Sequence, residues 1–204
     1  MRRQLASVGR GICTPKMVVR GSKLKEVVLK PKNATTQDII DGILMADTMG
    51  DDFILEEVHC LEGRNHYETM QNVWGFVKKN VRYVADKKGH EVIKSPGALF
   101  QTGFGDCKSM TLAVNSILKK LKVPRTYRFA AYDNDDFTHV YAIAHTPKGD
   151  VKLDTVYDKF DDEVRYVRKK DYSLNGLGNP APTASFGNII MLGIAAWLMI
   201  KMFK

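Results

Sequence analysis

The sequence predicts an α+β protein whose core is a cysteine-bearing helix packed on an antiparallel sheet that carries a histidine and an aspartate. Apolar residues recur with helical spacing after Cys107 and, beyond Pro124, alternate as they do in strands. Polar turns at residues 133–136 and 146–150 divide this second region into three strands. A chain of 204 residues with 44% apolar side chains can fill one well-packed core, so we expect one main domain over residues 33–173.

The central helix is expected to begin at Cys107. Asp106 is a favoured N-cap residue, and Pro124 cannot continue a helix. The last turn is rich in lysine, which suits the negative end of the helix dipole. The apolar positions that define this helix are Met110, Ala113, Val114, Ile117, Leu118 and Leu121. A thiol in its first turn faces the positive end of the dipole and unpaired backbone N–H groups, which favour the thiolate and could also receive an oxyanion.

Two further helices precede this one. Residues 35–38 resemble a capping box and are followed by apolar residues at helical spacing, which predicts a helix that packs on the core. A second stripe consists of Tyr67, Met70, Trp74, Val77 and Val81. Because Trp74 belongs to this stripe, we interpret it as a core residue.

The three predicted strands cover residues 126–132, 137–145 and 151–156. His139 lies on the second strand, on the face shared with Phe137 and Tyr141, because side chains alternate along a strand. Asp154 lies on the third strand, and the short turn between them can place it beside His139. Cys107, His139 and Asp154 are therefore the residue types of a thiol nucleophile, its imidazole base and the carboxylate that orients the base. Taken singly, each would more often be structural, but their conjunction favours a catalytic triad.

The motifs around these residues resemble the transglutaminase-like cysteine peptidase superfamily. The motifs that carry the resemblance are Ser95-Pro96-Gly97-Ala98-Leu99-Phe100, Gly105-Asp106-Cys107, Lys122-Val123-Pro124, Thr138-His139-Val140-Tyr141 and Leu153-Asp154-Thr155. The resemblance covers residues 65–156, which include the amphipathic helix that precedes the Ser95 motif. The resemblance implies a papain-like α+β fold with Cys107 as nucleophile, His139 as base and Asp154 as its orienting acid. It implies no choice among hydrolysis, deamidation and cross-linking, and some members with this core have lost activity.

The chain departs from the pattern of many relatives at two places. Lys108 and Ser109 follow the cysteine where many relatives carry acidic residues, and residues 151–153 lack the tryptophan that often precedes the aspartate. Gln101 lies six residues before Cys107, which is the spacing of the oxyanion glutamine in papain-like enzymes. We therefore predict Gln101 as the candidate second oxyanion donor, with an ordinary polar loop residue as the alternative.

The charge is concentrated at the N-terminus. Residues 1–32 contain nine basic side chains and one acidic side chain, so this arm carries the whole net charge of +8. One interpretation is a tether to an anionic surface, such as lipid head groups. The other is an ordered leader, because residues 17–19 and 27–29 could each add a short strand. The arm lacks the aromatic residues of a single-strand nucleic-acid platform and the apolar core of a signal peptide.

The cysteine content argues against a disulfide scaffold. Three cysteines at positions 13, 60 and 107 are odd in number and widely spaced, which excludes a complete disulfide framework and a close-spaced zinc cluster. Pairing of Cys13 with Cys60 stays open as a minor alternative. Thiol chemistry of the expected kind requires no cofactor and no metal, and we predict none.

The C-terminus predicts an attachment. Residues 174–183 form a linker rich in Gly, Pro and Asn, and residues 184–204 contain an unbroken apolar run from Ile189 to Ile200. A helix of about twenty residues spans the bilayer hydrocarbon, so we expect a single membrane anchor with Trp197 near one interface. A helix that buries itself in a protein assembly is the alternative.

Together these features predict a membrane-anchored, transglutaminase-like cysteine hydrolase that acts on protein or peptide amide bonds through an acyl-thioester. Because the resemblance extends to small bacterial and phage proteins, peptidoglycan or a virion protein are candidate substrates, and the virion membrane or capsid is a candidate location. The rival hypothesis is a structural or interaction protein of a virion or envelope, anchored by its apolar tail and basic arm.

Overall fold

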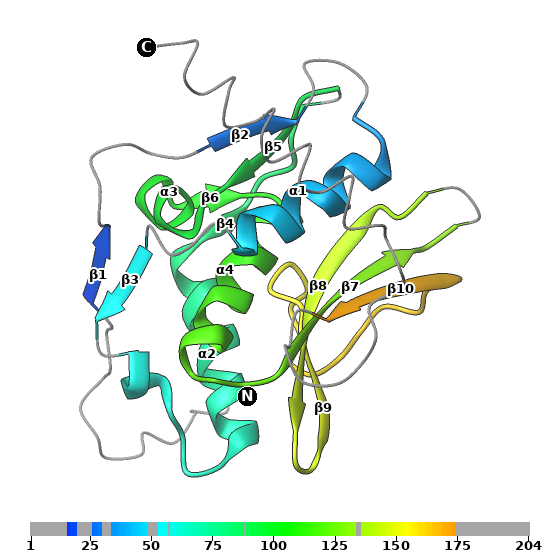
Figure 1. Cartoon of the computed structure of the whole chain (residues 1–204). Helices are drawn as coiled ribbons and strands as arrows, with labels where there is room; N and C mark the ends of the chain where they lie inside the picture. Colours follow the sequence, from blue (N-terminus) through cyan, green and yellow to red (C-terminus); the bar gives the residue numbers. More distant parts are fainter. Residues whose placement is uncertain are drawn as a thin grey trace, which may run out of the picture. The chain divides into compact units, whose positions relative to one another are not determined.

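The computed structural model describes residues 16–19, 26–29, 34–48, 53–56, 58–87, 89–133 and 136–173. They form the α+β arrangement that the sequence predicts (Figure 1). The helices are α1 (Thr36–Thr48), α2 (His66–Asn80), α3 (Pro96–Thr102) and α4 (Cys107–Lys120), with a 3-10 turn at Val58–Leu61. The strands are β1 (Lys16–Val19), β2 (Glu26–Leu29), β3 (Phe53–Glu56), β4 (Arg82–Tyr83), β5 (Glu91–Lys94), β6 (Phe104–Gly105), β7 (Arg125–Ala131), β8 (His139–Thr146), β9 (Gly149–Leu153) and β10 (Arg168–Ser173).

The main sheet has four antiparallel strands in the order β10-β7-β8-β9. Strands β7 and β8 pair with Ala130 opposite His139, and β8 pairs with β9 with Ala142 opposite Leu153. Strand β10 was not predicted from the sequence. Its residues are mostly exposed, so it lacks an alternating apolar pattern, and its backbone pairing with β7 places it at the sheet edge.

Strand β9 is shorter than predicted, which changes the setting of Asp154. The strand ends at Leu153, and Asp154 is the first residue beyond it. One carboxylate oxygen of Asp154 accepts hydrogen bonds from the backbone N–H groups of Val156 and Tyr157, at 3.0 and 3.3 Å. An aspartate that binds its own backbone two and three residues on favours a turn over a continued strand.

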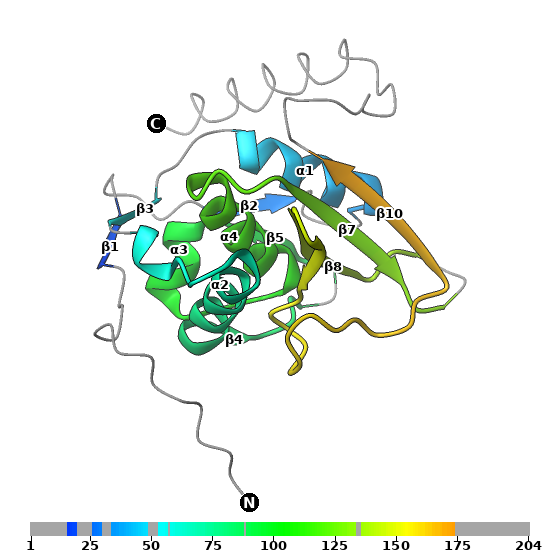
Figure 2. The same ribbon diagram turned by 90° about the horizontal axis from the view of Figure 1, so that it is seen from below.

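Helix α4 lies between the sheet and the other helices, and Figures 1 and 2 show it enclosed by α1, α2 and β8. Every residue from Cys107 to Leu118 is buried, although the sequence predicts only one apolar stripe. Some polar residues on the other faces find partners in the neighbouring elements, whereas the side-chain amide of Asn115 is buried without a hydrogen bond to any residue that the structure describes. The Thr111 hydroxyl, for example, donates to the carbonyl of Val140 on β8 at 2.9 Å.

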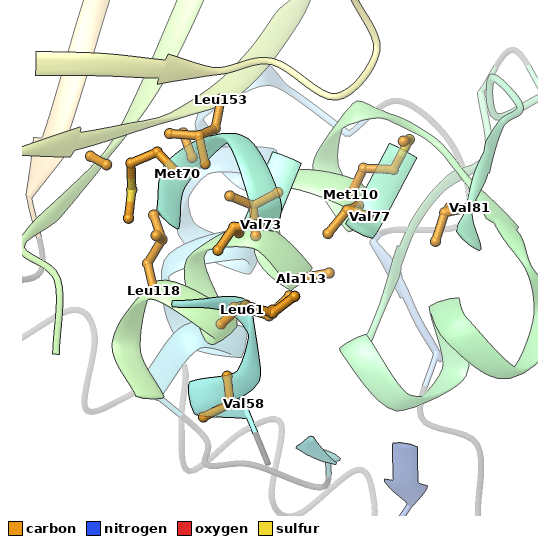
Figure 3. Packing of buried hydrophobic residues seen from close by; sticks show 14 of the residues in the cluster. Val58, Leu61, Met70, Val73, Val77, Val81, Met110, Ala113, Leu118 and Leu153 are labelled. Carbon is orange, nitrogen blue, oxygen red and sulfur yellow. The ribbon is translucent and has the colours of Figure 1, made fainter. Parts of the chain in front are cut away.

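The hydrophobic core is built on α2 and α4. Val73 and Val77 of α2 meet Met110 and Ala113 of α4, and Leu153 of β9 closes the same cluster (Figure 3). A second cluster joins α1, β5 and β7 around the start of α4 and includes the Cys107 side chain. The first turn of α4 thus contributes to both clusters, Met110 to the first and Cys107 to the second.

Helix α1 begins as the capping box predicts. The Asp38 carboxylate accepts from the backbone N–H of Thr35 at 2.9 Å, and the Thr35 hydroxyl accepts from the N–H of Asp38 at 3.2 Å. Near its other end, buried Asp47 accepts from Arg125 and from the Tyr127 hydroxyl, at 2.8 and 2.9 Å. These contacts fasten α1 to β7, which confirms that this helix packs on the core.

The two attachments are described only in part. Within the basic arm, strand β1 pairs with β3 and strand β2 pairs with β5, both antiparallel. The rest of residues 1–32 and all of residues 174–204 lie outside the described residues, so the tether and the anchor stay predictions. Among the helices in the described ranges, none combines the length and the apolarity that a bilayer-spanning segment needs.

Gly105 is expected to be required at the approach to α4. A Cβ atom there would lie 2.4 Å from Cδ1 of Leu99, which is fully buried, and 3.3 Å from Cβ of Ser109. Gly105→Ala should therefore lower the free energy of unfolding by about 1–3 kcal/mol through overpacking, measured by urea denaturation. Gly75 of α2 has no atom within 4 Å of such a Cβ. The control Gly75→Ala should raise stability by about 1 kcal/mol, and equal effects of the two changes would contradict this account.

Candidate active site

Cys107 is the first residue of α4, and Asp106 is its N-cap, as predicted. The Asp106 side chain accepts a hydrogen bond from the backbone N–H of Ser109 at 3.1 Å. Since the first turn of a helix has no intrahelical partners for its N–H groups, those of Cys107 and Lys108 point out of the helix end. Cys107 itself is 9% exposed, so its thiol is largely enclosed and lies against this positive end.

His139 begins β8 and contacts both other members of the predicted triad. Its Nε2 lies 2.7 Å from Oδ2 of Asp154. Nδ1 is the ring nitrogen that this contact leaves for the thiol, and the Cys107 side chain is a hydrogen-bond partner of the imidazole. The structure therefore brings together Cys107, His139 and Asp154, which are 47 or fewer positions apart in the sequence and come from a helix, a strand and a turn.

The protonation of His139 follows from these neighbours. Burial disfavours the imidazolium, but hydrogen bonds to Asp154 and Cys107 and the negative charges of both groups outweigh it and raise the His139 pKa to about 10. Because this pKa is above the value of about 6.5 for a free histidine, the contribution of His139 to stability is complete below that pH. It is lost as the pH rises through about 10.

Trp74 supports the acid of this trio from α2. Its indole N–H donates to the backbone carbonyl of Asp154 at 2.8 Å, while its ring packs on the core. The ammonium of Lys78, one helical turn further on, donates to the carbonyls of Thr155 and Val156 at 3.3 Å. Helix α2 thus holds the turn that presents the Asp154 carboxylate to His139.

The helical spacing of Trp74 predicted a core residue and gave no sign of this contact. The available signal was chemical, because a buried indole N–H nearly always requires an acceptor. The identity of that acceptor could not be predicted, since Trp74 and Asp154 are 80 positions apart.

Two tyrosine rings flank His139. The centroids of Tyr141 and Tyr132 lie 5.7 and 6.0 Å from that of the imidazole, with interplanar angles of 29° and 31°. The Tyr141 hydroxyl donates to the Glu163 carboxylate. The same carboxylate accepts a hydrogen bond from the Arg128 guanidinium, with an N–O distance of 3.2 Å. Burial, and then the charges of Asp154 and Cys107, raise the pKa of Tyr132 to about 12, so its phenol stays neutral. These rings restrict how the imidazole can turn and can stabilise its cation.

The surface beside the thiol is partly apolar. Tyr83 and Phe104 are 45% and 40% exposed, and the charge of Cys107 is among the causes that raise the pKa of Tyr83, after burial. A neighbouring pocket of about 480 Å³ reaches Gly105, two residues before the thiol. Its lining includes Val84, Asp86, His90, Lys94 and Phe104. A side chain of an extended substrate could enter this recess.

Gln101 lies in α3, a helix and not the loop of the alternative interpretation, and its side chain is exposed. Its role as a second oxyanion donor therefore stays a prediction.

The cysteines divide into two chemical states. Cys60 is disulfide-bonded, whereas Cys107 is a free thiol. Cys13 lies outside the described residues. The thiol that the triad requires is thus available in the described part of the chain.

One group of carboxylates has the spacing of a metal site. Single oxygens of Asp86, Glu91 and Asp106 all lie within 4.8 Å of one another. The ammonium of Lys108 stands among them, 2.6 Å from Glu91 and 3.2 Å from Asp86, and it also contacts Asp106. In this structure a lysine therefore supplies the positive charge that the group needs.

Comparison with models of known protein families and with curated protein sequences finds no match for this chain. Solved structures of similar fold include a candidate protease from Parabacteroides distasonis, with 10% identity over 82% of this chain and 42% of that one, at a TM-score of 0.49. Calcium-bound LapG from Legionella pneumophila matches with 18% identity over 67% and 84%, at a TM-score of 0.48. A TGase matches with 12% identity over 69% and 38%, at a TM-score of 0.38. The chain spans less than half the length of the Parabacteroides protein.

The His139–Asp154 contact makes a prediction for the pH titration of His139. Asp154→Asn keeps the size of the side chain but removes the charge that stabilises the imidazolium. We expect the His139 pKa, followed by NMR, to fall from about 10 while the fold persists. In a turnover assay the rate should fall by about 10²–10⁴-fold with little change in KM. Asp150 and Asp158 are the nearest alternative acids in the sequence. An unshifted His139 titration in the Asp154→Asn protein would show that Asp154 has been misassigned as the orienting acid.

Proposed function

We propose that this protein is a cysteine hydrolase that cleaves amide bonds of a peptide or protein. The observation that carries the proposal is the hydrogen-bonded series from the Cys107 thiol through His139 to Asp154 at the positive end of α4. The raised pKa of His139, about 10, keeps the imidazole protonated at neutral pH and lets it pair with a thiolate.

In the proposed reaction the thiolate of Cys107 attacks the amide carbonyl carbon and forms a tetrahedral oxyanion. The backbone N–H of Cys107 and a second donor, for which Gln101 is the candidate, receive this charge. The intermediate collapses as the C–N bond breaks and the His139 imidazolium gives its proton to the leaving amine. Neutral His139 then takes a proton from water, which attacks the thioester and releases the acid and the thiol.

Hydrolysis is proposed over acyl transfer because water needs no binding site of its own, whereas an amine acceptor does. Because the similar structures include a candidate protease, we propose a protein or peptide as the substrate. The proposed substrates also include peptidoglycan cross-links. No step of this mechanism uses a cofactor or a metal.

The proposal predicts an activated thiol. A free cysteine loses reactivity about tenfold for each pH unit below about 8.5. Alkylation of Cys107 by iodoacetamide should instead stay within about twofold between pH 8 and pH 6, because the His139 imidazolium stabilises the thiolate. His139→Ala should restore the steep dependence. The measurement is the alkylation rate, with peptide mapping to separate Cys107 from the other cysteines.

A steep pH dependence in the parent protein would instead favour the rival hypothesis, a scaffold that retains the fold without the chemistry. The matched control is Phe137→Ala, which changes a residue two positions before His139 that is not a member of the triad. This substitution should leave the pH dependence of Cys107 alkylation unchanged.

We also propose that residues 184–204 anchor the protein in a membrane and that the basic arm contacts its anionic surface. The support is the apolar run from Ile189 to Ile200 behind a Gly/Pro-rich linker, together with the charge of residues 1–32. Anchoring in a virion membrane, or burial of the same helix in a capsid, are the two locations that this arrangement would suit.

Deletion of residues 184–204 tests the anchor. The truncated protein should leave the membrane fraction on flotation in a density gradient and keep its circular dichroism spectrum, since α1 to β10 are complete without the tail. Loss of folded structure would make the tail part of the core, and continued flotation would place the membrane contact elsewhere.

A further inference from the structure

Lys108, the residue that follows the cysteine, is a buried charged residue at the start of α4. Its side chain is 7% exposed, and its ammonium lies among carboxylates from three separate segments. These are Asp86 after β4, Glu91 on β5 and Asp106 at the N-cap of α4, with N–O distances of 3.2 Å to Asp86 and 2.6 Å to Glu91. A buried ammonium is retained only where such partners compensate its loss of water.

The carboxylates need this cation as much as it needs them. Three carboxylate oxygens within 4.8 Å of one another repel strongly at a partly buried site, and Asp106 is almost wholly buried. Burial alone would remove charge from Lys108, but the three acids outweigh it and raise its pKa well above the ordinary value. The ammonium thus lies among three oxygens whose mutual spacing is that of a cation site.

Two of the acids also bind backbone N–H groups near the start of α4 and on β5. Asp106 binds Lys108 with one oxygen and caps the N–H of Ser109 with the other. Asp86 also accepts from the backbone N–H of Val92 on β5, at 2.7 Å. The Ser109 hydroxyl in turn accepts from the N–H of Lys94 on β5, at 3.1 Å. The cluster therefore joins β5, the segment after β4 and the first turn of α4.

We propose that Lys108 is a positioning residue that acts as a built-in cation, holding Asp106 and the first turn of α4 so that Cys107 faces His139. This inference rests on the proposed function, because it assigns a role in presenting the nucleophile. The parent protein then needs no divalent cation, since the lysine is permanently in place. A chain that lacks the ammonium keeps the three carboxylates and gains a requirement for a cation in its stead.

The test uses the full chain and two substitutions. Lys108→Ala removes the ammonium and leaves room beside the oxygens. Lys108→Ala combined with Asp86→Asn removes the ammonium and one cation ligand. Lys119→Ala is the matched control, because Lys119 is an exposed lysine on the same helix whose ammonium donates to the Asp47 carbonyl. The readouts are the alkylation rate of Cys107 at pH 7 and the melting temperature, each in EDTA and in millimolar CaCl₂.

We expect calcium to change neither readout in the parent or in Lys119→Ala. In EDTA, Lys108→Ala should alkylate about tenfold more slowly than the parent and melt at a lower temperature, because Asp106 is no longer held. Calcium should restore most of both properties in Lys108→Ala and neither in the double variant. A structural lysine alone would lower the melting temperature without giving this calcium response.

Two results would overturn the inference: parent-like alkylation of Lys108→Ala in EDTA, or no response of that variant to calcium. If Lys108→Ala folds in neither condition, Glu91→Gln decides, since it keeps the lysine and removes a partner that is only partly buried, at 28% exposed. Slower alkylation of a folded Glu91→Gln protein supports the positioning role, and an unchanged rate overturns it. A parent thiol that shows no activation would reject the proposed function instead, while the calcium response of the melting temperature still tests the built-in cation.

Discussion

The structure depends on the way α4 is fixed against β8. The Thr111 hydroxyl, one turn beyond Cys107, donates to the carbonyl of Val140, the residue after His139. This buried hydrogen bond fixes the position of α4 along β8, and the close packing of the helix, which is buried from Cys107 to Leu118, supports the same position. The thiol and the imidazole meet because both elements are held at this level, and the polar face of α4 is part of that fit.

Asp154 is positioned by a different set of contacts. Asp154 lies beyond the end of β9, and its place is determined by contacts on three sides: its own backbone turn, the imidazole of His139, and Trp74 on α2. Helix α2 therefore contributes side chains to the main hydrophobic core and also holds Asp154 in place through Trp74. A change in the packing of α2 would move the carboxylate as well as weaken the core, so stability and chemistry are coupled at this helix.

Charge is used in two opposite ways within one turn of α4. On the side facing His139, the proposed reaction requires the Cys107 thiolate, and the helix N-terminus and the His139 imidazolium both stabilise that negative charge. On the side facing β5, three carboxylates are held by Lys108. The lysine thus neutralises part of an acidic cluster that would otherwise oppose a thiolate at the neighbouring residue.

The sequence by itself determined the start of α4 and the succession of β7, β8 and β9, and it singled out Cys107, His139 and Asp154 as candidates, because caps, turns and hydrophobic periods act between residues close in the chain. Only the tertiary structure decided the support of Asp154 by Trp74, the partners of Lys108 and the pairing of β10 with β7. These contacts join residues up to 80 positions apart, and in β10 a polar strand is stabilised by backbone hydrogen bonds that leave no hydrophobic pattern. A lysine after the cysteine could be noticed in the sequence, but its burial among three acids depends on where β5 and the segment after β4 come to lie.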